Sequence, residues 1–218
     1  MMRSIKMNEN RIKRNKMYGE QIIKNLATRN MEGFYAESKE EALSIALSLI
    51  PKGSKVTWGG TMSAAEIGLK QALVEGDYEA YDRDACKTRE EKRAVEMLTY
   101  DSDYFIASCN AITEQGELVN IDGNANRVSA IAYGPHHVLM IVGMNKVAKD
   151  LDAAMSRARN VAAPINSQRF DLDTPCCKTG VCFDCKSPQT ICCQFLVTRY
   201  SKHPGRIKVI LVNEELGF

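Results

Sequence analysis

The stretch that decides the fold is residues 104–127, YFIASCNAITEQGELVNIDGNANR. It contains two apolar runs, residues 104–107 and 118–121, and each run is followed by polar residues. Short runs rich in aromatic and β-branched side chains predict buried strands. Ligands of α/β proteins bind beyond the carboxyl ends of the strands. We therefore expect the polar residues that follow these runs to form the functional site.

Helical and strand patterns alternate along the rest of the chain. The apolar runs predict further strands at residues 34–36, 55–58, 78–81, 138–142, 195–198 and 207–212, and the amphipathic segments predict helices at about residues 8–30, 38–50, 63–74, 88–100 and 145–163. Three of these helices begin with the spacing of a capping box: Ser38 with Glu41, Ser63 with Glu66 and Thr88 with Glu91.

This alternation predicts a single α/β domain over residues 1–218, with a mainly parallel sheet and helices on both faces. Residues 1–30 form a helical N-terminal extension in this interpretation, and residues 174–193 form a Cys-rich excursion before the last strands. Cyclic dimers are the commonest assembly of such proteins, so a homodimer is the default expectation.

The composition of the chain limits the classes of function that it can have. The chain has 218 residues, of which 44% are hydrophobic and 26% charged, as in ordinary globular proteins. Its net charge of +2 lacks the basic excess of a general nucleic-acid binder. Residues 1–17 are locally basic, which we interpret as the solvated first turn of a helix, with a contact to a partner or to nucleic acid as the alternative.

The hydropathy pattern predicts where in the cell the protein is located. The longest apolar run, residues 138–144, is far shorter than the roughly 20 residues of a spanning helix, so we expect no membrane insertion. The N-terminus has basic residues without an apolar region behind them, which is not the pattern of a secretory signal. We expect the protein in the cytoplasm.

A glycine-containing turn after the strand at 55–58 is a candidate ligand loop. Gly59 and Gly60 would let a ligand approach the backbone, and Thr61 and Ser63 lie where a helix start exposes amides to an anion. The alternative is a tight strand-to-helix turn without a ligand.

Polar residues after other strands are further candidates for binding a small anionic molecule. Arg127 could hold a phosphate or carboxylate in bidentate fashion, although a structural ion pair explains it equally well. Lys146 follows a buried strand and could neutralise an anionic substrate. The remaining candidates are Asn110, Asn124 and Asn126. His136 and His137 are neighbours on an extended backbone and must point to opposite sides, so neither is assigned a role.

Glu114 is the candidate catalytic residue. A partly desolvated carboxylate at a strand end could act as a nucleophile or general base. The alternative, which spacing alone favours, is a solvated turn residue.

Six of the eight cysteines lie between residues 174 and 193. In a reducing compartment this density favours metal or redox chemistry over disulfides. Our preferred ligand set is Cys176, Cys182, Cys185 and Cys192, because adjacent residues rarely both face one ion. Four thiolates suit zinc or an iron–sulfur cluster. The alternatives are a ligand set that begins at Cys177, reduced structural thiols without a metal, and disulfides formed on oxidation.

Several motifs together resemble the lactate-utilisation (LUD) domain family. They are residues 57–63 (TWGGTMS), 107–116 (ASCNAITEQG), 122–127 (DGNANR), 133–137 (YGPHH), 142–146 (VGMNK), the cysteine segment 174–192 and the closing residues 214–217 (EELG). The resemblance covers nearly the whole chain from about residue 10.

The resemblance implies a fold similar to that of ribose-phosphate isomerase, glucosamine-phosphate deaminase (NagB) and coenzyme A transferases. It also implies a role in bacterial lactate or related 2-hydroxy-acid utilisation, with oxidation to pyruvate beside iron–sulfur partner proteins. Glu114-Gln115-Gly116 is similar to the Glu-x-Gly segment that carries the nucleophile of coenzyme A transferases. Two other functions stay open: a stand-alone transferase or isomerase acting on a phosphorylated or coenzyme A-linked molecule, and a non-catalytic binding module with structural zinc.

Overall fold

The strand β7 (His137–Gly143) lies at the centre of the molecule in the computed structural model, which describes residues 8–218. Its apolar residues from Val138 to Val142 are all fully buried. Val138 and Met140 pack into one hydrophobic cluster, whereas Leu139 and Ile141 pack into another on the opposite face. Burying a large aliphatic side chain stabilises a fold by about 1.5–3 kcal/mol. The run therefore requires covering layers on both faces of its sheet.

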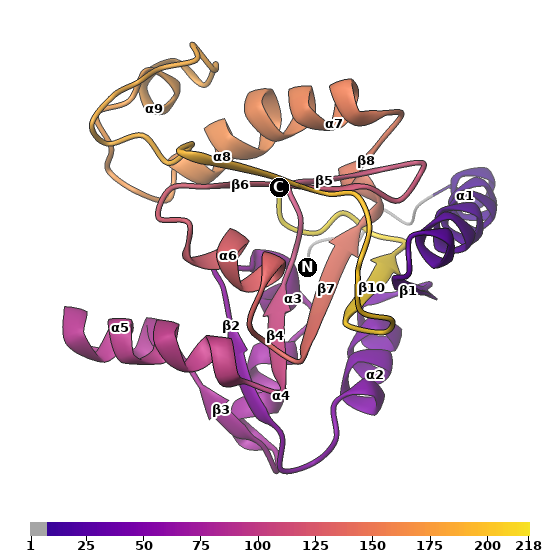
Figure 1. Ribbon diagram of the computed structural model, residues 1–218. Helices are drawn as coiled ribbons and strands as arrows, with labels where there is room; N and C mark the ends of the chain where they lie inside the picture. Colours follow the sequence, from indigo (N-terminus) through magenta and orange to yellow (C-terminus); the bar gives the residue numbers. More distant parts are fainter. Residues whose placement is uncertain (1–7) are drawn as a thin grey trace, which may run out of the picture.

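The sheet around β7 has six strands, all parallel, in the order β1-β10-β7-β4-β2-β3 (Figure 1). This confirms the predicted α/β class with a mainly parallel sheet. The other five strands are β1 (Glu32–Ala36), β2 (Lys55–Trp58), β3 (Glu79–Tyr81), β4 (Tyr104–Ala107) and β10 (Ile207–Val212).

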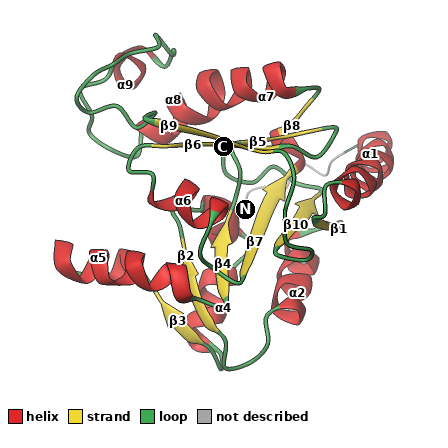
Figure 2. Cartoon of the chain, in the orientation of Figure 1, coloured by secondary structure: helices red, strands yellow, loops and turns green. Residues whose placement is uncertain are grey.

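Helices cover both faces of this sheet (Figure 2). On one face pack α2 (Lys39–Leu49), α3 (Met62–Glu66) and α4 (Leu69–Glu75). On the other pack α1 (Glu9–Thr28) and α6 (Asn126–Ala132). The helix α5 (Arg89–Leu98) has no buried residue and is peripheral.

A second, four-stranded sheet covers the face that carries α1 and α6, and it was not predicted. Its order is β8-β5-β6-β9, with bounds β5 (Ala111–Thr113), β6 (Leu118–Asp122), β8 (Val147–Ala148) and β9 (Gln194–Thr198). The strands β6 and β9 pair antiparallel, so the apolar runs at 118–121 and 195–198 lie outside the parallel sheet. The two paired strands are more than 70 residues apart in sequence, and a pattern of neighbouring residues cannot predict such a pairing.

The outer face of the second sheet packs against a long helical segment. Ala111, Val119 and Ile121 contact Ala154 and Ala158. The segment consists of α7 (Leu151–Arg157), a π-helical part (Ala158–Ala162) and α8 (Ala163–Ser167), and the short helix α9 (Pro175–Thr179) follows in the Cys-rich loop. The predicted start at residue 145 was wrong, because residues 144–146 form a 3₁₀ turn and 147–148 pair with β5. The helix instead begins after Asp150, whose side chain accepts a hydrogen bond from the Ala153 amide at 2.9 Å.

One of the three predicted capping boxes is complete, that of Thr88 and Glu91. The second is half-formed: Ser38 accepts a hydrogen bond from the Glu41 amide, but the Glu41 carboxylate accepts from the amide of Glu37 and not from that of Ser38. The third prediction was wrong: Thr61, not Ser63, caps α3 by accepting from the Ala64 amide at 3.3 Å. Because the cap lies two residues earlier, the Ser63 hydroxyl is free for another role.

The N-terminal extension forms α1, which is buried through Ile22 and Leu26. The first part of the basic segment, residues 1–7, lies outside the described residues. Within residues 8–218, no helix combines the length and apolar character that crossing a bilayer requires.

The turn that precedes β7 provides a test of this packing. Gly134 has φ +117°, and a Cβ there would lie 2.7 Å from Tyr100 Cδ1 and 2.9 Å from Tyr100 Cα. Gly134→Ala should lower the free energy of unfolding by about 3 kcal/mol or more, because backbone strain and overpacking add. Gly53→Ala is the control: it has φ +76° and open space around the new Cβ, so it should cost only about 1–2 kcal/mol. Equal losses in urea unfolding would contradict the packing described.

Candidate functional site

Three polar side chains meet at the carboxyl edge of the parallel sheet. The Lys146 ammonium donates to Ser63 Oγ at 2.9 Å and to Ser108 Oγ at 3.0 Å. Ser108 follows β4, Lys146 follows β7, and Ser63 lies in the first turn of α3 after β2. The parallel topology thus gathers residues that are far apart in sequence, as expected of such an edge.

Lys146 is a buried cation that forms no ion pair with a carboxylate among residues 8–218. Its exposed fraction is 2%, and among residues 8–218 only hydroxyl oxygens accept from its ammonium. Burial lowers the pKa of Lys146 to about 8 from 10.5. A buried charge is costly unless it is paired. The arrangement therefore favours the approach of an anion.

A second cation lies beside this cluster. The Arg127 guanidinium donates to Asn110 Oδ1 at 3.3 Å and to the carbonyl of Ile121, and it lies 3.8 Å from the Asp122 carboxylate. Burial lowers the pKa of Arg127, which Asp122 partly offsets. A Cβ on Gly59 would lie 3.1 Å from the Arg127 side chain, so the Gly-Gly turn and the loop at 122–127 are in contact.

Sequence reasoning missed two residues of this edge. Arg157 lies in the segment predicted as an amphipathic helix and is assigned no role by the sequence, but it is half-buried and donates to the carbonyls of Asn145, at 2.9 Å, and Asn110. Ser108 is not among the predicted site residues, although it directly follows a buried strand.

Burial raises the pKa of Cys109 to about 11, and Lys146, Arg157 and Arg127 counteract that rise. Three cationic side chains therefore act electrostatically on one buried thiol.

The other candidate ligand residues are engaged locally. Thr61 caps α3, and Asn126 Nδ2 donates to Glu96 Oε1 at 2.8 Å. Gly60 and Asn124 are exposed, Asn124 in a turn whose amide donates to Asp122.

The edge is closed in this conformation. The cavity between Gly59 and Arg127 has a volume of about 10 Å³, which is room for one water molecule. Over Lys146 lies the segment 214–217: the Leu216 carbonyl accepts from Ser63 Oγ at 3.3 Å, and a Cβ on Gly217 would lie 3.4 Å from the ammonium.

Glu114 lies apart from this cluster. Its carboxylate accepts from the Tyr18 hydroxyl at 2.6 Å and from Lys149 Nζ at 3.1 Å, and its carbonyl accepts from Asn25 at 2.7 Å. The hydrogen bonds from Tyr18 and Lys149 lower the pKa of Glu114. These contacts fasten α1 to the β5–β6 turn, and none of them involves the Gly-Gly turn or Arg127.

The four preferred cysteines line one cavity of about 220 Å³ in the Cys-rich loop. The loop with α9 projects beyond α7 and α8, away from the parallel sheet (Figure 1). The pKa of Cys192 rises to about 11, first because of burial and then because of the neighbouring thiols. Among residues 8–218, no three His, Cys, Asp or Glu side chains are already placed as ligands of one ion. The thiols therefore share a cavity without forming a closed coordination sphere.

The second cysteine of each doublet does not line this cavity. Cys177 Sγ donates to the Ser167 carbonyl at 3.2 Å, and Cys193 Sγ contacts the Thr190 carbonyl at 3.6 Å. The Cys176 thiol also contacts Ser167 Oγ and Thr174 Oγ1, each at 3.5 Å, so it is the lining of the cavity, and not hydrogen bonding, that distinguishes Cys176 and Cys192 within their doublets.

Comparison with known proteins adds the following findings. The family model of the LUD domain matches residues 19–212. No curated protein matches the chain. The crystal structure of a DUF162 family protein from Deinococcus radiodurans is similar, with a TM-score of 0.52 and 13% identity over 90% of this chain and 97% of that chain. At that identity the similarity concerns the fold alone.

The burial of Lys146 makes a pH-dependent prediction. Its folded-state pKa of about 8 lies below the ordinary 10.5, so the unfolded chain binds more protons between these values. The contribution of Lys146 to stability is therefore most unfavourable below about pH 8 and improves as the pH rises towards 10.5. Relative to Lys146→Met, the native protein should gain about 3 kcal/mol over this interval. Urea unfolding at several pH values measures the difference.

Lys52→Met is the matched control, because it removes an exposed ammonium. Its stability difference from the native protein should stay constant over the same interval. A constant difference for Lys146→Met as well would show that the ammonium is not buried as described.

Proposed function

Because the chain belongs to the LUD domain family, which is associated with lactate utilisation, we propose that it is a metal-carrying component of lactate or related 2-hydroxy-acid oxidation to pyruvate. It acts in the cytoplasm beside iron–sulfur partner proteins. The observation that carries the proposal is the cavity shared by Cys176, Cys182, Cys185 and Cys192.

The donor set fits a soft metal centre. Thiolates are ligands for zinc or for an iron–sulfur cluster, and a Cys-x-x-Cys pair such as Cys182 and Cys185 brings two sulfurs together from one turn. All eight cysteines are free thiols. An iron–sulfur cluster would supply one-electron transfer, whereas zinc would supply only folding stability. Cys176, Cys182, Cys185 and Cys192 would hold either group.

The cationic edge supplies the complementary part of the proposal. A 2-hydroxy acid carries a carboxylate, and Lys146 is a buried cation whose only acceptors among the described residues are the hydroxyls of Ser63 and Ser108. Binding a carboxylate there requires displacement of the segment 214–217, which Asn145, Ser63 and Glu66 hold by hydrogen bonds. Arg127 and Asn110 extend the same anion-binding edge. A catalytic role for Glu114 stays a prediction, to be tested with Glu114→Gln.

Metal content tests the ligand set. Protein purified without oxygen should contain zinc, or iron with acid-labile sulfide and a brown colour. Cys182→Ser and Cys192→Ser should each lose most of this metal, because a tetrahedral thiolate site needs all four ligands. Cys177→Ser and Cys193→Ser are the matched controls and should retain it. Metal-free native protein, or equal losses in all four variants, would refute the assignment.

Growth on lactate tests the metabolic role. Deleting the gene for this chain should abolish growth of its host on L-lactate but not on pyruvate. The native gene and Cys177→Ser should restore growth, whereas Cys176→Ser should not. Normal growth of the deletion strain on lactate would exclude the proposed role, even if the metal site is present.

A further inference from the structure

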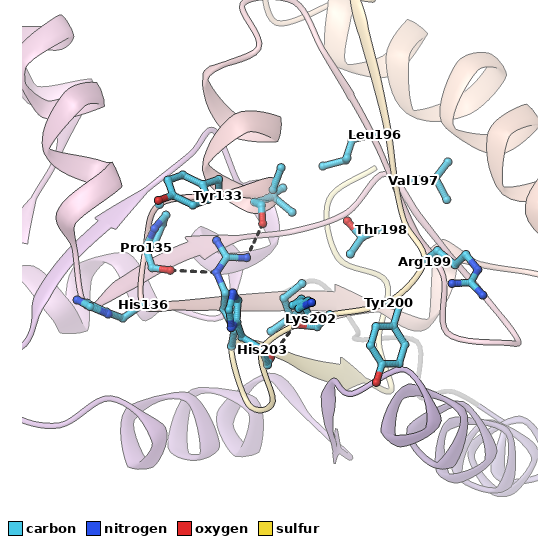
Figure 3. Close-up of a pocket in the computed structure, with 16 residues that line it drawn as sticks. Tyr133, Pro135, His136, Leu196, Val197, Thr198, Arg199, Tyr200, Lys202 and His203 are labelled. Atoms are coloured by element: carbon cyan, nitrogen blue, oxygen red, sulfur yellow. Dashed lines mark hydrogen bonds between the residues drawn. The ribbon is translucent and has the colours of Figure 1, made fainter.

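A cavity of about 770 Å³ lies at the edge of the parallel sheet opposite to Lys146, where β7 and β10 begin. One side is formed by the connection from α6 to β7, and the other by β9 and the connection from β9 to β10 (Figure 3). Its volume lies in the range of about 300–1,000 Å³ that is typical of small-molecule sites. The lactate proposal assigns no role to any residue of this cavity.

The lining of the cavity is basic. The basic side chains are those of Arg199, Lys202, Arg206, His136 and His203, and no Asp or Glu of residues 8–218 lines the cavity. Arg199 and Lys202 are exposed, and their cationic groups make no hydrogen bond or ion pair with residues 8–218. The carboxylate of Glu32, beside the adjacent Gly205, is already paired with Lys208 at 2.7 Å. Two cations of the lining are therefore available to an anionic ligand.

Arg206 has a different role. Its guanidinium donates to the carbonyls of Pro135 at 3.1 Å, Ile131 at 2.7 Å and Ala130 at 3.1 Å. These bonds join the start of β10 to the end of α6 and to the turn before β7. Arg206 therefore fixes the wall of the cavity and leaves ligand binding to Arg199 and Lys202.

Two tyrosine rings flank the lining. Tyr133 is 80% exposed and Tyr200 is 54% exposed, although large aromatic side chains are usually buried. Figure 3 shows them on opposite sides of the cavity. Neither hydroxyl makes a hydrogen bond within residues 8–218. Exposed rings of this kind stack on planar heterocycles, and each stacked base contributes about 1–3 kcal/mol to the binding free energy.

We propose that this cavity binds a nucleotide-class small molecule, with its phosphates on Arg199 and Lys202 and its ring against Tyr200 or Tyr133. Cationic groups without partners bind phosphate through charge-assisted hydrogen bonds. Exposed aromatic rings supply the stacking surface, and the volume admits both parts of such a ligand. The weak net charge of the chain, +2, favours a small ligand over a nucleic-acid polymer.

Calorimetric titration of the full chain with ADP, adenosine and inorganic phosphate tests the proposal. ADP should bind more tightly than either fragment, because it alone uses both the cations and the rings. Arg199→Gln/Lys202→Gln should raise the Kd for ADP by about tenfold or more. Tyr200→Leu/Tyr133→Leu should weaken ADP binding without altering phosphate binding.

Arg93→Gln/Lys52→Gln is the matched control, since it removes two exposed cations that lie outside the cavity. It should leave the Kd for ADP unchanged, and thermal unfolding should confirm that all variants fold. The proposal is overturned if ADP does not bind at millimolar concentration, if adenosine binds as tightly as ADP, or if the two double-cation variants behave alike. These outcomes are independent of metal content and of growth on lactate.

Discussion

The burial of β7 on both faces is the constraint on which the rest of the structure depends. A strand whose alternate side chains enter two separate hydrophobic clusters must lie inside a sheet with a covering layer on each side. All its neighbours are parallel, so every connection crosses a face and the carboxyl ends of the strands collect at one edge. Lys146 ends the 3₁₀ turn that follows β7 and therefore lies at that edge as a buried ammonium.

The second sheet in turn determines where the Cys-rich loop is attached. Its strands cover the face with α1 and α6, and its edge strand β9 begins immediately after Cys193. The loop is thus fixed at one end by β9, where the Cys193 amide donates to the Asp122 carbonyl at 3.0 Å. At the other end of the loop, the carbonyl of Ser167 in α8 accepts a hydrogen bond from the Cys177 thiol. Both anchoring cysteines are the doublet members that do not line the cavity. The anchors leave Cys176 and Cys192 to line it.

The sequence predicted the elements whose signals are local. The continuous apolar run of β7 and the capping box of Thr88 and Glu91 each lie within a few residues, and both were located correctly. What escaped prediction depends on contacts distant in sequence: the pairing of β6 with β9, the inward course of Arg157, and the position of Glu114 against α1. Ser63 illustrates the difference. Its spacing to Glu66 imitates a capping box, but Thr61 takes the cap and Ser63 turns towards Lys146, a residue 83 positions away.

The molecule thus carries chemically distinct regions on separate parts of one fold: a closed cationic edge, a thiol-lined cavity in a projecting loop, and a basic cavity at the opposite edge of the sheet. The central claim is that the thiol-lined cavity binds a metal. X-ray absorption spectroscopy of protein purified without oxygen tests this claim most directly. At the zinc or iron edge, the account predicts a metal surrounded by sulfur alone, at about 2.3 Å. A first shell of nitrogen or oxygen, or the absence of any bound metal, would contradict it.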